Sequence, residues 1–207
     1  MSSRETIDRI VDLFSVALIS AAALLTALCG YQSGRWGEEQ TLRYNVANGY
    51  RVQSAEAAGR ANALTTIDVT LFLNYVTAIE RGDARTAEFI FRRFRPEMRP
   101  AMDAWLATRP FSNPKAPLSP FTMPEYSLRT TADSRRDNAM AGASFVSAQN
   151  ASRSADAFLL LTVLFATVSF LAGVSTKMVY PSHAIVVVLG FVGLIYGIIR
   201  LVDLPYQ

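Results

Sequence analysis

The sequence predicts an all-α membrane protein, with three transmembrane helices and an extended helical extramembrane domain inserted between the first and the second. Two observations lead to this class. Three apolar runs are each long enough to cross a bilayer as a helix, for which about 20 residues suffice. The long segment between the first two runs is polar and mixed in charge, and it lacks the alternation of apolar and polar residues that marks a half-buried strand.

Composition narrows the functional classes. The chain has 207 residues, which is enough for one modest domain and a few spans. Its formal net charge of +3 is too small to indicate a nucleic-acid-binding protein. The only cysteine, Cys29, excludes a disulfide within the chain, so cysteine usage indicates no compartment.

The first predicted span covers residues 10–31 and follows a short N-terminal segment, residues 1–9. It holds one charged residue, Asp12, near its start. A cleaved secretory or lipoprotein signal is the alternative. The run is longer than the apolar part of a signal peptide, and Leu28 precedes Cys29 where cleavage would need a small residue. We therefore expect a retained anchor.

The second and third spans are predicted at residues 158–180 and 184–202, and a short tail, residues 203–207, follows. The loop between these spans contains Pro181, which cannot continue the second helix, and Ser182, a favourable N-cap for the third. The two spans are therefore expected to form a tight hairpin.

The third span carries three glycines near one helical face: Gly190, Gly193 and Gly197. Small residues let helix backbones approach closely in lipid. Two interpretations stay open. The glycines pack the three spans of one chain together, or they form the interface of a homo-oligomer.

The charges at the span ends favour one orientation. With an odd number of spans, the N-terminal segment and the hairpin loop share one side, and the domain and the tail share the other. The first side carries Arg4, Arg9 and Lys177, whereas the tail side carries Arg200. The positive-inside rule then predicts a cytoplasmic N-terminus and an outside domain. Basic residues just after the first span, such as Arg35, favour the reverse.

The domain between the first two spans, residues 32–157, is expected to be helical. Residues 38–80 lack proline and predict a helix that continues the first span. The residues at near-heptad spacing in its first part, from Leu42 and Val46 onward, are largely polar, so that part is expected to face solvent. An apolar stripe then predicts a packing face, which Phe72 and Val76 widen: Leu64, Ile67, Leu71, Tyr75 and Ile79.

Two short helices are predicted next. Gly82 ends the long helix and Asp83 caps a new one over residues 83–95. Pro96 fits the first turn of a second short helix over residues 97–108.

The segment 109–124 is rich in proline and in apolar residues, which predicts an ordered strap packed on the helices. A polyproline docking segment for a partner is the alternative. Residues 126–177 again lack proline, and they predict one long helix that runs antiparallel to residues 38–80 and enters the membrane.

No residue is predicted to be catalytic, to bind a cofactor or to bind a metal. His183 is the only histidine, so a histidine cluster or a Ser–His triad cannot be assembled in one chain. Asp12 lies near a span end, where its side chain can reach the interface or belong to a proton pathway. Four arginines form either an anion or lipid-headgroup site or a solvated face: Arg92, Arg93, Arg95 and Arg99.

Residues 91–97, 104–106 and 113–117, together with 164–166 and 172–177, resemble a group of bacterial three-pass membrane proteins of unknown function. The resemblance implies a bacterial inner-membrane location and no mechanism. The layout also resembles that of the stator subunits of proton-driven envelope energisers, whose domain is cytoplasmic, but no matching sequence accompanies this likeness.

These features predict a non-enzymatic protein that binds a partner or belongs to an envelope assembly. An oligomeric channel, transport subunit or stator-like subunit is the alternative. The expected partners are the lipid bilayer and either a homo-oligomer or an envelope protein, with no nucleic acid and no cofactor.

Overall fold

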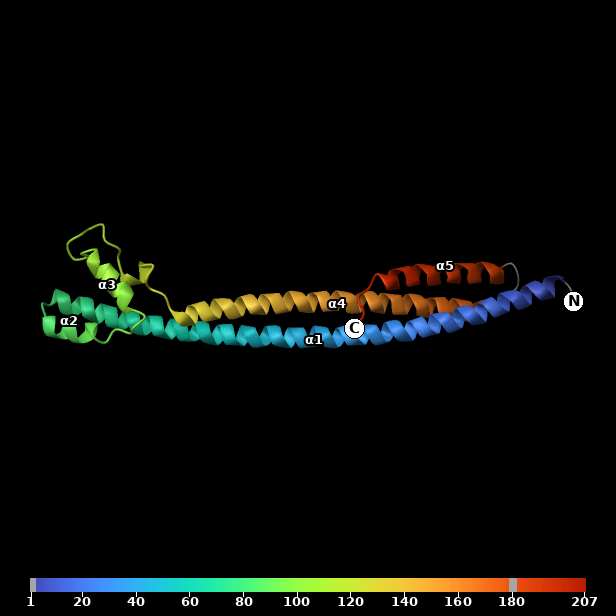
Figure 1. Ribbon diagram of the computed structural model, residues 1–207, viewed down its shortest axis with the longest axis horizontal. Helices are drawn as coiled ribbons and strands as arrows, with labels where there is room; N and C mark the ends of the chain where they lie inside the picture. Colours follow the sequence, from blue (N-terminus) through green and yellow to red (C-terminus); the bar gives the residue numbers. More distant parts are fainter. Residues whose placement is uncertain (1–2, 179–181) are drawn as a thin grey trace. The chain divides into compact units, whose positions relative to one another are not determined.

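The computed structural model describes residues 3–178 and 182–207, and every regular element in these ranges is a helix (Figure 1). This confirms the all-α class, since the described residues include no strand. The elements in chain order are α1 (Ser3–Glu80), α2 (Ala84–Phe91), α3 (Arg99–Ala107), the 3-10 turn η1 (Pro120–Thr122), α4 (Arg129–Ser175) and α5 (Ser182–Val202).

Helices α1, α4 and α5 are each long and apolar enough to cross a membrane. The candidate span at the N-terminal end belongs to a helix that continues to Glu80, far beyond the length that a crossing needs. The predicted end of the second span at Tyr180 and the proline turn at Pro181 lie outside the described residues, and α5 begins at Ser182.

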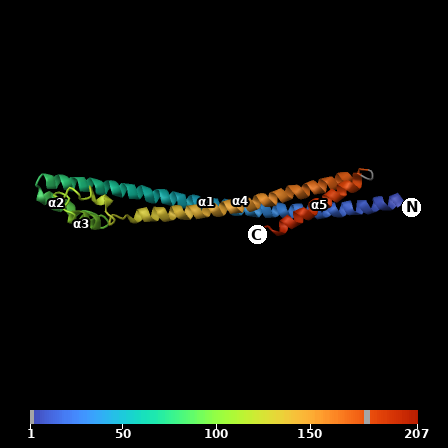
Figure 2. The same ribbon diagram turned by 90° about the horizontal axis from the view of Figure 1, so that it is seen from above.

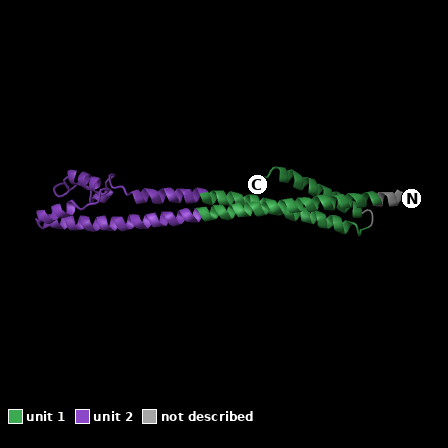
Figure 3. Cartoon of the chain, turned by 60° about the horizontal axis from the view of Figure 1, so that its bottom comes forward, with its two compact units in different colours: residues 1–46, 144–207 green, residues 47–143 purple. Residues whose placement is uncertain are grey.

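The chain divides into two compact units (Figure 3). Unit 1 comprises Met1–Val46 and Ser144–Gln207 and includes the apolar parts of α1, α4 and α5. Unit 2, Ala47–Ala143, lies in the sequence between the two segments of unit 1 and includes α2, α3 and η1.

Within unit 1, α1 and α4 run antiparallel. Ser169 Oγ donates to the carbonyl of Ile19 at 3.4 Å, and Ser33 Oγ donates to that of Ala155 at 3.0 Å. Helix α5 lies beside α4 (Figures 1 and 2). The three helices enclose an apolar core: Leu18, Ala22, Cys29, Phe158, Leu161, Phe165, Val168, Ala172, Leu194 and Leu201.

Within unit 2, α1 and α4 also run antiparallel, and small residues separate them. Ser54 Oγ donates to the carbonyl of Ser134 at 2.8 Å. Ala57, Ala61 and Ala141 are buried between the helices. Because an alanine side chain is one methyl group, the two backbones can approach closely.

The predicted packing face of α1 was only partly right. Tyr75 and Phe72 are buried as predicted, but Ile67 and Ile79 are exposed, and Ala78, which was not predicted, is buried. The reason is that the prediction followed the large apolar side chains. The helix instead presents positions seven residues apart, many of them occupied by alanine or serine.

The break between α1 and α2 is as predicted. Gly82 has a φ of +72°, a left-handed conformation that glycine adopts without steric cost. The Asp83 carboxylate accepts a hydrogen bond from the Thr86 backbone N–H at 3.0 Å and so caps α2.

The predicted bounds of the two short helices were too wide. Helix α2 ends at Phe91 rather than Arg95, and α3 begins at Arg99 rather than Glu97. Pro96 lacks a backbone N–H and disfavours helical geometry at Arg95, so the chain turns between the helices instead.

The proline-rich segment after α3 is an ordered strap, as predicted. Trp105 Nε1 on α3 donates to the carbonyl of Pro117 at 2.7 Å. Phe121 in η1 packs edge-on against Phe72 of α1, with ring centroids 5.6 Å apart. The strap, α1, α2 and α3 thereby share one core: Phe72, Tyr75, Ala78, Ala87, Phe94, Met98, Met102 and Trp105.

Candidate functional site

The three glycines of α5 face the other two helices of the same unit. A Cβ atom placed on any of them would lie 3.0 Å or less from a side chain of α1 or α4: Gly190 would meet Leu18 at 2.6 Å, Gly193 would meet Val168 at 3.0 Å and Gly197 would meet Phe165 at 2.5 Å. This face of α5 is therefore occupied within the chain. Whether copies of the chain also associate stays a prediction.

The four arginines singled out in the sequence do not converge on one point. Arg95 points to α1, whereas Arg92 and Arg93 are exposed just after α2 and Arg99 is exposed at the start of α3. Each of these three has an intramolecular partner: Arg92 pairs with Glu88 at 2.6 Å, Arg93 lies over the Phe89 ring at 3.4 Å and Arg99 donates to the Arg92 carbonyl at 2.7 Å.

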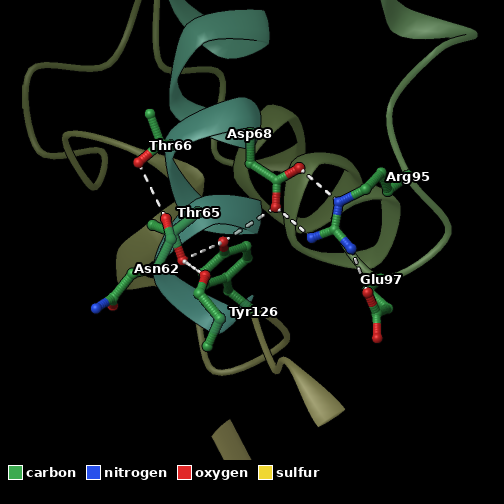
Figure 4. A network of polar contacts seen from close by, with 8 residues as sticks. Asn62, Thr65, Thr66, Asp68, Arg95, Glu97 and Tyr126 are labelled. Carbon is green, nitrogen blue, oxygen red and sulfur yellow. Dashed lines mark hydrogen bonds and ion pairs between the residues drawn. The ribbon is translucent and has the colours of Figure 1, made fainter. Parts of the chain in front are cut away.

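Arg95 belongs to a polar network in unit 2 that is centred on the buried Asp68 (Figure 4). Its guanidinium binds Asp68 of α1 in a bidentate manner, with Nε 3.1 Å from Oδ1 and Nη2 2.7 Å from Oδ2. The Tyr126 hydroxyl, from the segment before α4, donates to Asp68 Oδ2 at 3.1 Å. Glu97 forms a second ion pair with Arg95. Asp68 thus joins three segments that are far apart in the sequence.

Burial controls the electrostatics of this network. The Asp68 carboxylate is fully buried, whereas the Arg95 side chain keeps about a fifth of its surface exposed. The hydrogen bonds from Arg95 to Asp68 raise the pKa of Arg95, which stabilises its charged form. Burial raises the pKa of the Tyr126 hydroxyl, so this hydroxyl keeps its proton and donates to Asp68. Asp68, Arg95 and Tyr126 are therefore all bonded within the network, which holds together the segments that carry them.

The sequence contained a pattern that predicts this network, but it was missed because the prediction considered only the spacing of apolar residues. Asp68 follows Ser54 and Ala61 at intervals of seven residues, so it occupies the same buried face as they do. A single carboxylate buried on this face needs a cationic partner that is buried with it. Spacing alone does not identify Arg95 as that partner, because the contact depends on the turn between α2 and α3.

A second buried polar group lies at the start of α5. His183 Nε2 is 3.2 Å from Ser15 Oγ and 3.9 Å from Asp12 Oδ1, and both partners belong to α1. Ser15 and His183 are buried. The Ser15 hydroxyl donates to the Val11 carbonyl at 2.9 Å, so its oxygen is left to accept from His183. Both contacts use the same ring nitrogen, which is not the geometry of a catalytic triad.

The C-terminal tail is held against α1 in unit 1. The Gln32 side chain donates to the Gln207 carbonyl at 3.0 Å and accepts from the Gln207 N–H at 3.1 Å. Trp36 Nε1 donates to the Pro205 carbonyl at 3.0 Å. These bonds tie the end of α5 to the first helix.

Comparison with known proteins gives no information about the function. The chain matches no protein-family model, no curated protein and no solved structure. Within residues 3–178 and 182–207, no three histidine, cysteine, aspartate or glutamate side chains lie close enough to hold a metal ion.

Proposed function

We propose that the chain is a non-enzymatic, multi-pass protein of the bacterial inner membrane whose helical domain lies in water and binds a protein partner, as part of an envelope assembly. The N-terminus is cytoplasmic and the domain is outside. The orientation is supported by Arg9 and Lys177 on the N-terminal side against Arg200 beside the tail.

One observation carries the partner-binding proposal. Leu118, in the proline-rich strap of unit 2, is 95% exposed, and Phe111 in the same strap is 53% exposed. The hydrogen bond from Trp105 to Pro117 holds the chain next to Leu118 in place. A fixed apolar tip loses little conformational entropy on binding, so it suits a contact with another protein. A shallow, largely apolar groove of about 300 Å³ adjoins it, lined in part by Leu73 of α1.

The experiment compares two exposed positions in unit 2. A photo-crosslinking amino acid replaces Leu118 in one variant and Val52, 58% exposed on α1, in the other. Both variants are irradiated in native membranes. We expect a covalent adduct with a second, different protein at position 118 and none at position 52. No adduct at 118, or the same adducts at both positions, would contradict the proposal.

The oligomeric channel, transport or stator-like alternative gains no specific support. Its motivation was the glycine face of α5, and that face packs on Leu18, Val168 and Phe165 of the same chain. An ion flux across liposomes together with an oligomeric mass in detergent would favour this alternative.

A further inference from the structure

A groove runs between α4 and α5 in unit 1. Its volume is about 290 Å³. Leu160, Leu161 and Leu164 of α4 line one wall, and Tyr196 and Arg200 of α5 line the other. Leu160 is 71% exposed, so the groove is open to its surroundings along the α4 wall.

Most of the groove is apolar, and one end of it is basic. Its walls are mainly leucine and the ring of Tyr196, and both helices are apolar enough to lie in a membrane. Arg200 lies near the end of α5, which finishes at Val202. A long basic side chain near a helix end can place its charge at the headgroup level while its stem stays in the apolar region.

Arg200 is also free to bind an anion. Among the residues that the structure describes, none forms an ion pair or a side-chain hydrogen bond with its guanidinium. Asp203 follows three residues later, but it neither pairs with Arg200 nor lines the groove. An unpaired guanidinium beside an apolar groove is complementary to a molecule with a phosphate at one end and a hydrocarbon chain at the other.

We propose that this groove binds one phospholipid with an anionic headgroup, with an acyl chain between α4 and α5 and the phosphate on Arg200. The inference rests on the membrane location in the proposed function. It is independent of the partner site at Leu118 in unit 2, so failure of one leaves the other intact.

The test is native mass spectrometry of the full chain in detergent with equal amounts of phosphatidylglycerol and phosphatidylcholine. We expect one phosphatidylglycerol to be retained in preference. Arg200→Gln is expected to weaken this retention about tenfold, the effect of losing one charge-assisted contact. Arg200→Lys should retain part of the preference. Arg153→Gln, which removes an exposed arginine of α4 that does not line the groove, should change nothing.

A second variant tests the apolar part. Leu160→Trp adds bulk to the groove at an exposed position that can accept it without refolding, so it should lower the retention of both lipids. Equal retention of the two lipids by the unsubstituted protein would overturn the proposal. So would equal losses for Arg200→Gln and Arg153→Gln. Inorganic phosphate that displaces the lipid at millimolar concentration would assign Arg200 to a free-anion site and also overturn it.

Discussion

Asp68 is a single carboxylate on which three segments of unit 2 depend. Arg95 and Tyr126 both bind it, and it has no exposed surface. Replacing a buried ion pair with apolar groups is often harmless, but removing one partner leaves the other without its counter-charge. The network is therefore sensitive to single substitutions.

We expect Asp68→Ala to lower the free energy of unfolding of unit 2 by about 2–3 kcal/mol, below the usual cost for a fully buried pair because Arg95 is partly solvated. Denaturant unfolding in detergent, followed by Trp105 fluorescence in a Trp36→Phe background, would measure this. Asp103→Asn, at an exposed position of α3, is the control and should change stability by less than about 0.5 kcal/mol. Equal effects of the two substitutions would show that the network contributes nothing.

Tyr126 links the same network to pH. Its pKa in the folded chain is raised, mainly by burial, above its value in the unfolded chain. A raised pKa stabilises the fold fully below the unfolded pKa, about 10, and this contribution is lost as pH rises through the folded pKa.

We therefore expect unit 2 to lose stability as the pH rises above about 10. Tyr126→Phe should cost about 1–2 kcal/mol at neutral pH, because the bond to Asp68 is lost. The variant should then show a weaker alkaline loss. Unfolding curves at neutral and alkaline pH, with tyrosinate absorbance recorded in parallel, would check both parts. An identical alkaline loss in the two proteins would assign it to other groups.

At the scale of single elements, α5 shows how one glycine can determine helix packing. A Cβ atom on Gly197 would lie 2.5 Å from Cε1 of Phe165, whose ring is itself buried. Neither the ring nor α5 can yield without disturbing the core of unit 1.

We expect Gly197→Ala to destabilise the association of α5 with α4 by about 1–3 kcal/mol. Gly173→Ala on α4 is the matched control, because nothing lies within 4 Å of a Cβ atom there. Since alanine favours helix over glycine, that control should be neutral or slightly stabilising. Thermal unfolding of both variants in detergent would measure the difference. Comparable melting temperatures would contradict the packing described for α5.

The elements differ in how far the sequence could predict them. The apolar runs and the Gly82–Asp83 break depend on local chemistry, and both were predicted. The end of α2 and the start of α3 were misplaced, because Pro96 makes the chain turn there and the burial of Phe94 in this turn depends on the folded chain. The pairing of Asp68 with Arg95, and that of His183 with Ser15, joins residues brought together only by the fold.

For the whole chain, orientation in the membrane is the proposal that most constrains its partners. Single cysteines at Ser112 in unit 2 and Ser182 at the start of α5, both exposed, can report it in a Cys29→Ala background. With a membrane-impermeant thiol reagent on intact cells, we expect labelling at position 112 and protection at position 182. The opposite pattern would place the domain in the cytoplasm and favour stator-like partners.

The small side chains packed between α1 and α4 in unit 2, here called the alanine seam, affect how the two helices align. A seam whose small side chains recur every seven residues would pack nearly as well if one helix slid along the other by a whole repeat. The polar contacts remove that freedom, because Ser54 bonds Ser134 of α4, and Asp68 bonds Tyr126 just before α4, in only one register. In this helix pair, alanine permits the close approach, and a few polar contacts specify which residues meet.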